Sequence, residues 1–225
     1  MKVGTDSDLL GTLSEGGECI LDIGTGTGVL SLMLAQRYPE ARLTAVEIDD
    51  QAVLDAKANF AASPWADRIT LHHMSFQQYL ERVKEEGQPE RYDSVVCNPP
   101  YFDKSLEPDD LGRTRARHTS SLPFRTLAQG AYELLREGGV FSVCIPPEVL
   151  AAFQAECVFA GFSLKHTYAI KTVPDREVKR YILVHQKGHV DTPETHTFCM
   201  RHADRTRSQW YLDLMRDFLV NPSRL

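Results

Sequence analysis

The residues with the clearest chemical potential lie at 97–102, Cys-Asn-Pro-Pro-Tyr-Phe, directly after an apolar run. Two adjacent prolines make a rigid corner, because proline fixes φ and has no N–H to donate. If Asn98 Oδ1 and the Pro99 carbonyl each accept an N–H of an exocyclic amine, its nitrogen can turn its lone pair toward a methyl donor. Pro100 keeps Pro99 extended, and Tyr101 can stack on a flat base. We therefore predict that these four residues are catalytic.

A glycine-rich loop comes earlier in the chain, in LDIGTGTGVL, and places Gly24, Gly26 and Gly28 between a strand and a helix. A valine occupies the last glycine position of the dinucleotide fingerprint, and the Asp22 carboxylate would repel a phosphate. Asp22 suits a ligand with an ammonium or sulfonium, and Glu47 at the end of the next strand can accept ribose hydroxyls. This pattern favours S-adenosylmethionine, with a nicotinamide dinucleotide site or an unliganded turn as alternatives.

The third strand is followed by Ser75 and Phe76, which in this architecture would face the cofactor adenine. The alternative is a helix N-cap serine and a core phenylalanine. His72 and His73 lie within the strand and point to opposite faces, so they do not predict a shared metal site. No other spacing of histidine, cysteine and aspartate in the sequence indicates a metal.

Strand-like runs alternate with helical patterns along most of the chain, as in a parallel sheet covered on both faces. The expected strands are 18–23, 42–48, 68–74, 92–97 and 138–145. The expected helices are 29–38, 49–62, 75–86 and 123–136. Because parallel strands bind ligands outside their carboxyl ends, the glycine loop and the Asn98–Tyr101 corner should share one crevice.

Two later runs, 162–171 and 179–187, are joined by a turn with Pro174 and should pair antiparallel at the sheet edge. Residues 190–225 predict a short strand and a closing amphipathic helix. We expect one α/β domain over 1–225, Rossmann-like, with a seven-stranded mostly parallel sheet and an antiparallel edge strand.

The composition is that of a globular protein, with 42% hydrophobic residues and a net charge of −6. No apolar run is long enough for a membrane span, and the first residues lack the apolar core of a signal peptide. The five cysteines form no CxxC pair, which favours reduced, buried thiols. We expect a cytoplasmic protein, and a monomer.

The order and spacing of DIGTGTG, VEID and NPPYF resemble class I methyltransferases that act on adenine N6 or glutamine N5. MKVGTDSDLLG, LSLMLAQR, SPWADRI and CNPPYF are similar to the bacterial tRNA1(Val) adenine-N6 methyltransferase family. The resemblance implies methylation of the adenine beside the anticodon and a cofactor-side role for residues 2–6. The expected cofactor contacts are Lys2, Thr5, Asp22, Gly24, Thr25, Gly26, Gly28, Glu47, Ile48, Ser75, Phe76 and Asn98.

A basic segment, 111–125, follows the catalytic corner and contains no acidic residue. Arginine can pair with phosphates and stack on unpaired bases, so an acidic protein could hold tRNA here. A solvated surface segment is the alternative. The expected RNA contacts are Phe102, Arg113, Arg115, Arg117, His118, Lys179 and Arg180.

Two departures from the family pattern bear on these expectations. Family members usually carry residues before KVGTD, so part of a cofactor lid or RNA surface is expected to be missing. Ser75 stands where many methyltransferases have an acid. A protein glutamine-N5 methyltransferase could use the same Asn-Pro-Pro-Tyr corner, although such enzymes usually have a helical domain ahead of the glycine strand.

Overall fold

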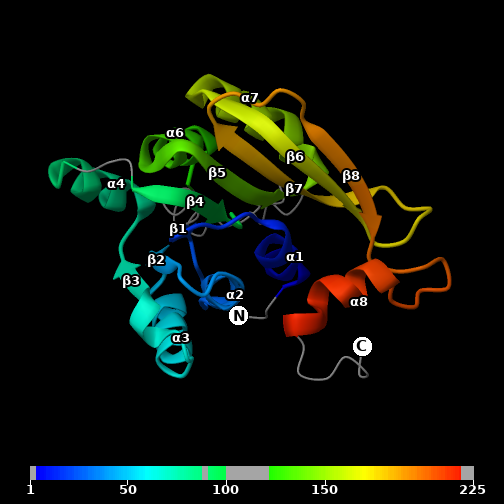
Figure 1. The fold of residues 1–225 in the computed structure, drawn as a ribbon, viewed down its shortest axis with the longest axis horizontal. Helices are drawn as coiled ribbons and strands as arrows, with labels where there is room; N and C mark the ends of the chain where they lie inside the picture. The colour runs from blue at the N-terminus through cyan, green and yellow to red at the C-terminus, as the bar shows by residue number, and fades with distance from the viewer. Residues whose placement is uncertain (1–3, 88–90, 100–121, 219–225) are drawn as a thin grey trace, which may run out of the picture.

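The computed structural model describes residues 4–87, 91–99 and 122–218 of the 225-residue chain. Within these ranges strands and helices alternate as far as residue 171, and two further strands then precede the last α-helix (Figure 1). The strands are β1 (Cys19–Ile23), β2 (Arg42–Glu47), β3 (Ile69–His73), β4 (Tyr92–Cys97), β5 (Leu135–Ile145), β6 (Phe162–Lys171), β7 (Val178–Lys187) and β8 (Glu194–Cys199). The α-helices are α1 (Thr5–Leu13), α2 (Val29–Arg37), α3 (Asp50–Ala61), α4 (Phe76–Glu85), α6 (Phe124–Leu134), α7 (Leu150–Ala160) and α8 (Gln209–Met215).

The strands of the described ranges form a single sheet in the order β3-β2-β1-β4-β5-β7-β6-β8. Only β7 runs against its neighbours, and every other pairing is parallel. The predicted Rossmann-like α/β class is therefore confirmed. Two details of the prediction are wrong: the sheet has eight strands instead of seven, and the antiparallel strand is not at its edge.

The edge strand next to the β6–β7 hairpin is β8, which the sequence predicts only as part of a C-terminal appendage. The hairpin of β6 and β7 joins the sheet through β7, which pairs antiparallel with β5. This arrangement leaves the outer side of β6 open, and β8 pairs with it in parallel. Alternating hydrophobicity marks both strands of a hairpin but does not specify which of them meets the existing sheet.

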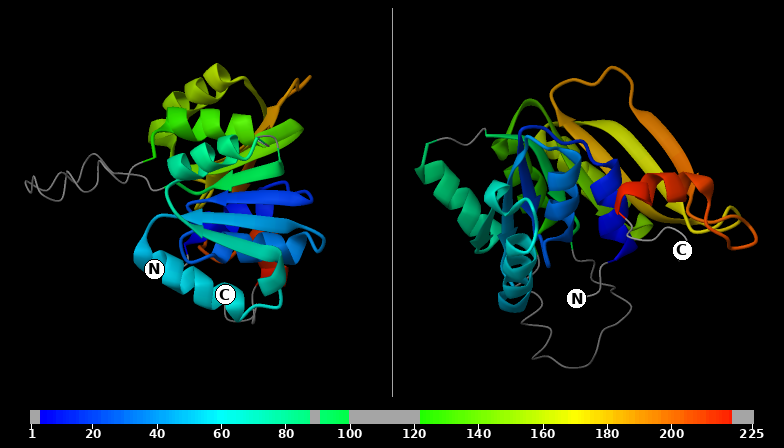
Figure 2. Two further views of the ribbon diagram at one scale, coloured as in Figure 1. Left: turned by 90° about the vertical axis from the view of Figure 1, so that its left-hand side faces the viewer. Right: turned by 60° about the horizontal axis from the view of Figure 1, so that its bottom comes forward.

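Helices cover both faces of the sheet, as predicted (Figure 1; Figure 2, left). On one face α4, α6 and α7 contribute apolar side chains to a core with β1, β4 and β5. On the other face α1, α2 and α8 pack in a second core, and α3 adds a small cluster around Phe60. None of the described helices is long and apolar enough to cross a membrane.

The sequence does not predict α1 and α7. In α7 (LAAFQAECVFA) apolar residues occur on nearly every side, so the helical period gives little contrast between buried and exposed faces. Phe153 and Cys157 are fully buried, whereas Phe159 is 82% exposed. The predicted helix at 123–136 ends at Leu134, because β5 begins at the next residue.

The loop between β1 and α2 offers a test of how closely it packs against α3. Gly26 and Gly28 both have φ in the left-handed region (59° and 86°), but a Cβ at Gly28 would overlap the Phe60 ring, whereas none at Gly26 meets an atom within 4 Å. Both alanine variants should lose about 1–2 kcal/mol through backbone strain. Gly28→Ala should lose about 1–3 kcal/mol more through overpacking.

Urea unfolding of Gly26→Ala and Gly28→Ala, without added ligand, measures this difference directly. Equal losses in the two variants would mean that the ring of Phe60 moves aside freely and that this contact does not fix the loop.

Candidate active site

The glycine loop follows β1 at the carboxyl ends of the parallel strands. Gly24, Gly26 and Gly28 all adopt φ values of 59–86°, which only glycine takes without strain. The N–H of Gly24 donates to the Val46 carbonyl (2.9 Å), and that of Gly28 donates to the Thr25 carbonyl (3.0 Å). A Cβ at Gly24 or Gly26 would face open space in the described structure. The loop therefore leaves backbone exposed to a ligand at these two positions.

The Asp22 carboxylate lies beneath this loop and is 1% exposed. Its Oδ2 accepts hydrogen bonds from the hydroxyls of Thr25 (2.6 Å) and Ser31 (2.7 Å). Its Oδ1 is buried and makes no hydrogen bond with any described residue. Burial raises the pKa of Asp22 to about 6, against the two hydroxyl bonds that lower it. One oxygen of a buried carboxylate is thus left to interact with a ligand.

The Glu47 side chain ends β2 and links it to the loop. Its Oε2 accepts the Gly26 N–H (2.8 Å), and its Oε1 accepts the N–H groups of Ile48 (2.8 Å) and Asp49 (2.9 Å). These bonds fix the carboxylate, and Oε2, which accepts only one of them, retains capacity to accept a hydroxyl. Ile48 beside it is 51% exposed, so an apolar surface borders the same place.

Ser75 and Phe76, both predicted to contact the cofactor, have structural partners. Ser75 is the N-cap of α4 in a capping box, accepting the Gln78 N–H while its own N–H donates to the Gln78 side chain. Phe76 is 5% exposed and packs in the core. The structure therefore shows the alternative interpretation of this pair, cap and core, and a cofactor contact stays a prediction.

Asn98 follows β4 and lies at the same end of the parallel strands as the glycine loop. The last pair of the parallel β1–β4 ladder is Ile23 with Cys97, so Gly24 and Asn98 leave adjacent strand ends side by side. The Asn98 amide nitrogen donates to Ser7 Oγ (3.1 Å) in the first turn of α1. This bond orients the amide, so that its carbonyl oxygen remains as an acceptor.

Sequence reasoning missed both Ser7 and Ser31. Ser7 is 91 residues from Asn98, and nothing local to either residue indicates their contact. Ser31 gave a weak signal, since it lies in the first turn of the helix that follows the glycine loop. Its hydroxyl is fully buried and bound to Asp22.

Cys97 immediately precedes Asn98, but its thiol is not suited to nucleophilic chemistry. The side chain is 2% exposed. Burial, followed by the nearby charges of Asp22 and Glu47, raises the pKa of Cys97 well above its ordinary value. A neutral thiol is a poor nucleophile, so the chemistry of the site does not depend on this cysteine.

The remaining predicted residues divide into two groups. Arg180 Nε pairs with Asp6 Oδ2 (2.8 Å), which joins β7 to the first turn of α1, where Thr5 also lies. Lys179 is exposed, and Pro99 is buried. The others fall outside the described residues: Lys2, Pro100, Tyr101, Phe102, Arg113, Arg115, Arg117 and His118.

Comparison with known proteins identifies the family. The family model described as "Methyltransferase small domain" matches residues 3–149. A tRNA1(Val) (adenine(37)-N6)-methyltransferase of Phocaeicola vulgatus is 40% identical over 98% of this chain and 92% of its own length. That of Bacteroides thetaiotaomicron is 38% identical over 98% and 91%. A predicted O-methyltransferase from Agrobacterium tumefaciens has the same fold, with a TM-score of 0.72 at 20% identity over 94% of this chain and 95% of its own. The chain belongs to the tRNA1(Val) (adenine(37)-N6)-methyltransferase family.

Proposed function

We propose that this protein transfers a methyl group from S-adenosylmethionine to the N6 amine of an adenine in tRNA, adenine 37 of tRNA1(Val). The observation that carries the proposal is the juxtaposition of Asn98 with the glycine loop at one sheet edge. The relatives that are 38–40% identical are named for this reaction. A tRNA substrate would place the enzyme in the cytoplasm, and we expect it to act as a monomer.

The residues around the loop fit this methyl donor. The Asp22 Oδ1 atom, buried and without a hydrogen bond among described residues, offers a partner for an ammonium. Gly24 and Gly26 leave room for close approach of the ligand, and Oε2 of the fixed Glu47 carboxylate can accept a ribose hydroxyl. When bound, S-adenosylmethionine supplies an electrophilic methyl group on a sulfonium.

The part of Asn98 is to hold the adenine amine. Its carbonyl oxygen can accept one N–H while the Ser7 hydroxyl holds its amide nitrogen. The Pro99 carbonyl would accept the second N–H, and Tyr101 would stack on the base. Two acceptors favour a pyramidal nitrogen whose lone pair points at the methyl carbon. The acceleration of methyl transfer would therefore come from orientation and electrostatics.

The RNA surface is proposed to follow the catalytic corner along the basic segment 111–125. The chain carries a net charge of −6, so phosphate binding needs a local concentration of arginine. Lys179 is exposed and could extend this surface. Arg180 is bound to Asp6, and its main effect is expected on the position of α1.

The direct test is incubation of the protein with radiolabelled S-adenosylmethionine and tRNA from a strain that lacks the enzyme. Nuclease digestion and chromatography should yield labelled N6-methyladenosine from one tRNA species. A protein substrate labelled on glutamine, with unlabelled tRNA, would instead favour the glutamine-N5 alternative and contradict the proposal.

Asp22→Asn tests the buried carboxylate through pH. Because burial raises its pKa from 3.8 to about 6, the stability it contributes is fully present below 3.8 and is lost as pH rises through 6. Between about pH 4.5 and about pH 7.5, wild type should lose about 2 kcal/mol of unfolding free energy relative to Asp22→Asn.

Cofactor binding should show the opposite trend. Wild-type affinity for S-adenosylmethionine should fall as pH drops below about 6, since a neutral carboxyl no longer attracts the ammonium. Asp22→Asn should bind weakly at every pH, without this slope. Calorimetry measures the affinity of wild type and of the variant as a function of pH. An equal dependence of affinity on pH in the variant would show that a group other than Asp22 titrates.

Asn98→Ala tests the acceptor at the corner. Methyl transfer should fall about a hundredfold or more, while affinity for S-adenosylmethionine is retained. Ser7→Ala should reduce kcat by about tenfold, because the amide loses the partner that orients it. Ser7→Thr keeps a hydroxyl and should restore most of this loss. Unchanged turnover in Asn98→Ala would refute the assigned role.

The double variant Arg115→Glu/Arg117→Glu tests the RNA surface. It should raise the tRNA concentration needed for half-maximal rate and flatten the dependence of binding on salt, because fewer phosphates are neutralised. Arg42→Glu is the control, since Arg42 is exposed at the start of β2, opposite the catalytic edge. If the double variant and the control behave alike, the basic segment does not bind RNA.

A further inference from the structure

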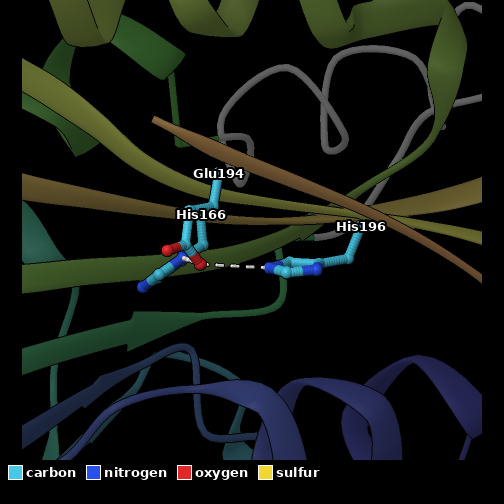
Figure 3. Close-up of side chains that lie close together, drawn as sticks. All are labelled: His166, Glu194 and His196. Carbon is cyan, nitrogen blue, oxygen red and sulfur yellow. Dashed lines mark hydrogen bonds and ion pairs between the residues drawn. The ribbon is translucent and has the colours of Figure 1, made fainter. Parts of the chain in front are cut away.

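A cluster of two histidines and a glutamate lies on β6 and β8, away from the candidate active site. In the parallel pairing of these strands His166 is opposite Glu194, and Tyr168 is opposite His196. Side chains two residues apart on a strand share a face, so all three polar groups project from the same side. Figure 3 shows both imidazoles beside the Glu194 carboxylate.

The spacing of the ligand atoms suits a small cation. Glu194 Oε2 lies 3.4 Å from His166 Nδ1 and 3.2 Å from His196 Nε2. One ligand atom from each of the three residues lies within 4.8 Å of the others. Bonds of about 2.0 Å in tetrahedral geometry put neighbouring ligand atoms about 3.3 Å apart. Binding would require only small side-chain adjustments.

A second carboxylate lies on the other side of the His166 ring, where it can support the tautomer that a metal needs. Glu15 Oε1 lies 3.4 Å from His166 Nε2, while Lys165 holds the other oxygen of Glu15 at 2.6 Å. Carboxylates lie at the same distance from both ring nitrogens, so a metal bound between His166 Nδ1 and Glu194 would fix the proton on Nε2, where Glu15 can accept it. That Nδ1 atom is buried and makes no hydrogen bond with any described residue.

The surroundings add rigidity and negative potential. The His196 ring stacks on Tyr168, with centroids 5.4 Å apart and planes 18° apart. The carboxylates of Glu15 and Glu194 both lie beside the His166 ring, and their negative charge attracts a cation.

We propose that His166, Glu194 and His196 bind a divalent transition-metal ion, with Zn²⁺ the best match. Two imidazoles and one carboxylate form a three-ligand set that leaves the fourth position to water. The ion would cross-link β8 to β6. Glu194 begins β8, whereas Asn98 follows the end of β4, which runs in the same direction. The metal site therefore lies toward the amino ends of these strands, and the proposed catalytic corner lies at their carboxyl ends.

The test uses the full chain after treatment with a chelator. Titration with Co²⁺ should produce the visible absorption of a tetrahedral site at one equivalent, and Zn²⁺ should displace it. His196→Gln and Glu194→Gln should each bind at least tenfold more weakly. Glu15→Gln should weaken binding by about 10- to 100-fold, as loss of a carboxylate behind a ligating histidine does.

His189→Gln is the matched control, because His189 is exposed and pairs with Asp191 in the turn before β8. It should leave binding unchanged. Zn²⁺ should also raise the melting temperature of wild type and of His189→Gln, but not that of His196→Gln, whose fold without metal is checked by circular dichroism. If His196→Gln does not fold, Glu194→Gln replaces it.

Three results would overturn the proposal. The first is the absence of saturable binding in wild type. The second is an equal loss of affinity in His189→Gln, which would indicate that the metal binds to scattered surface histidines. The third is a thiolate-to-cobalt absorption band, which would point to a cysteine such as Cys199, whose side chain alternates to the opposite face of β8.

Discussion

The parallel register of β1 and β4 is the constraint on which the candidate site depends. Asp22 pairs with Val96 and Ile23 with Cys97, so both strands end at the same level. The loop after β1 and the corner after β4 consequently meet at the carboxyl ends of these strands. A shift of one residue would turn Asp22 out of the buried layer and direct the Asn98 amide elsewhere. The hydrogen-bond ladder of two buried strands thus sets the distance between the glycine loop, the proposed site of the methyl donor, and Asn98, the proposed partner of the acceptor amine.

The buried carboxylate of Asp22 shows how binding competes with stability at this edge. Among the described residues, only one of its oxygens receives hydrogen bonds, and burial disfavours its charge. A folded protein gains nothing from an uncompensated buried carboxylate at neutral pH. A cationic ligand would supply the missing partner, and the cofactor complex should therefore be considerably more stable than the free protein. The hydroxyls of Thr25 and Ser31 reduce the free-energy cost of burying this charge when no ligand is bound.

Much of the site follows from sequence, because its chemistry is concentrated in two short motifs at strand ends. Asp22, the loop glycines and Glu47 are placed by a strand–loop–helix pattern that elementary rules recognise. The contact of Ser7 with Asn98 could not be predicted, since it depends on how α1 packs across the sheet. The same holds for Arg180, expected at the RNA surface but bound to Asp6. The position of β8 depends on which strand of the preceding hairpin joins the sheet, and the cluster of His166 and Glu194 exists only because β8 pairs with β6.

Helix α1 connects these long-range contacts. Its first turn binds Asn98 through Ser7 and Arg180 through Asp6. Just beyond its end, the Glu15 carbonyl accepts the Ser94 hydroxyl (2.6 Å), while its carboxylate faces β6. Contacts with three strands leave the helix little freedom to rotate or slide. The orientation of the Asn98 amide is therefore determined by packing that extends to β6 and β7, and changes on these strands can reach the candidate active site through α1.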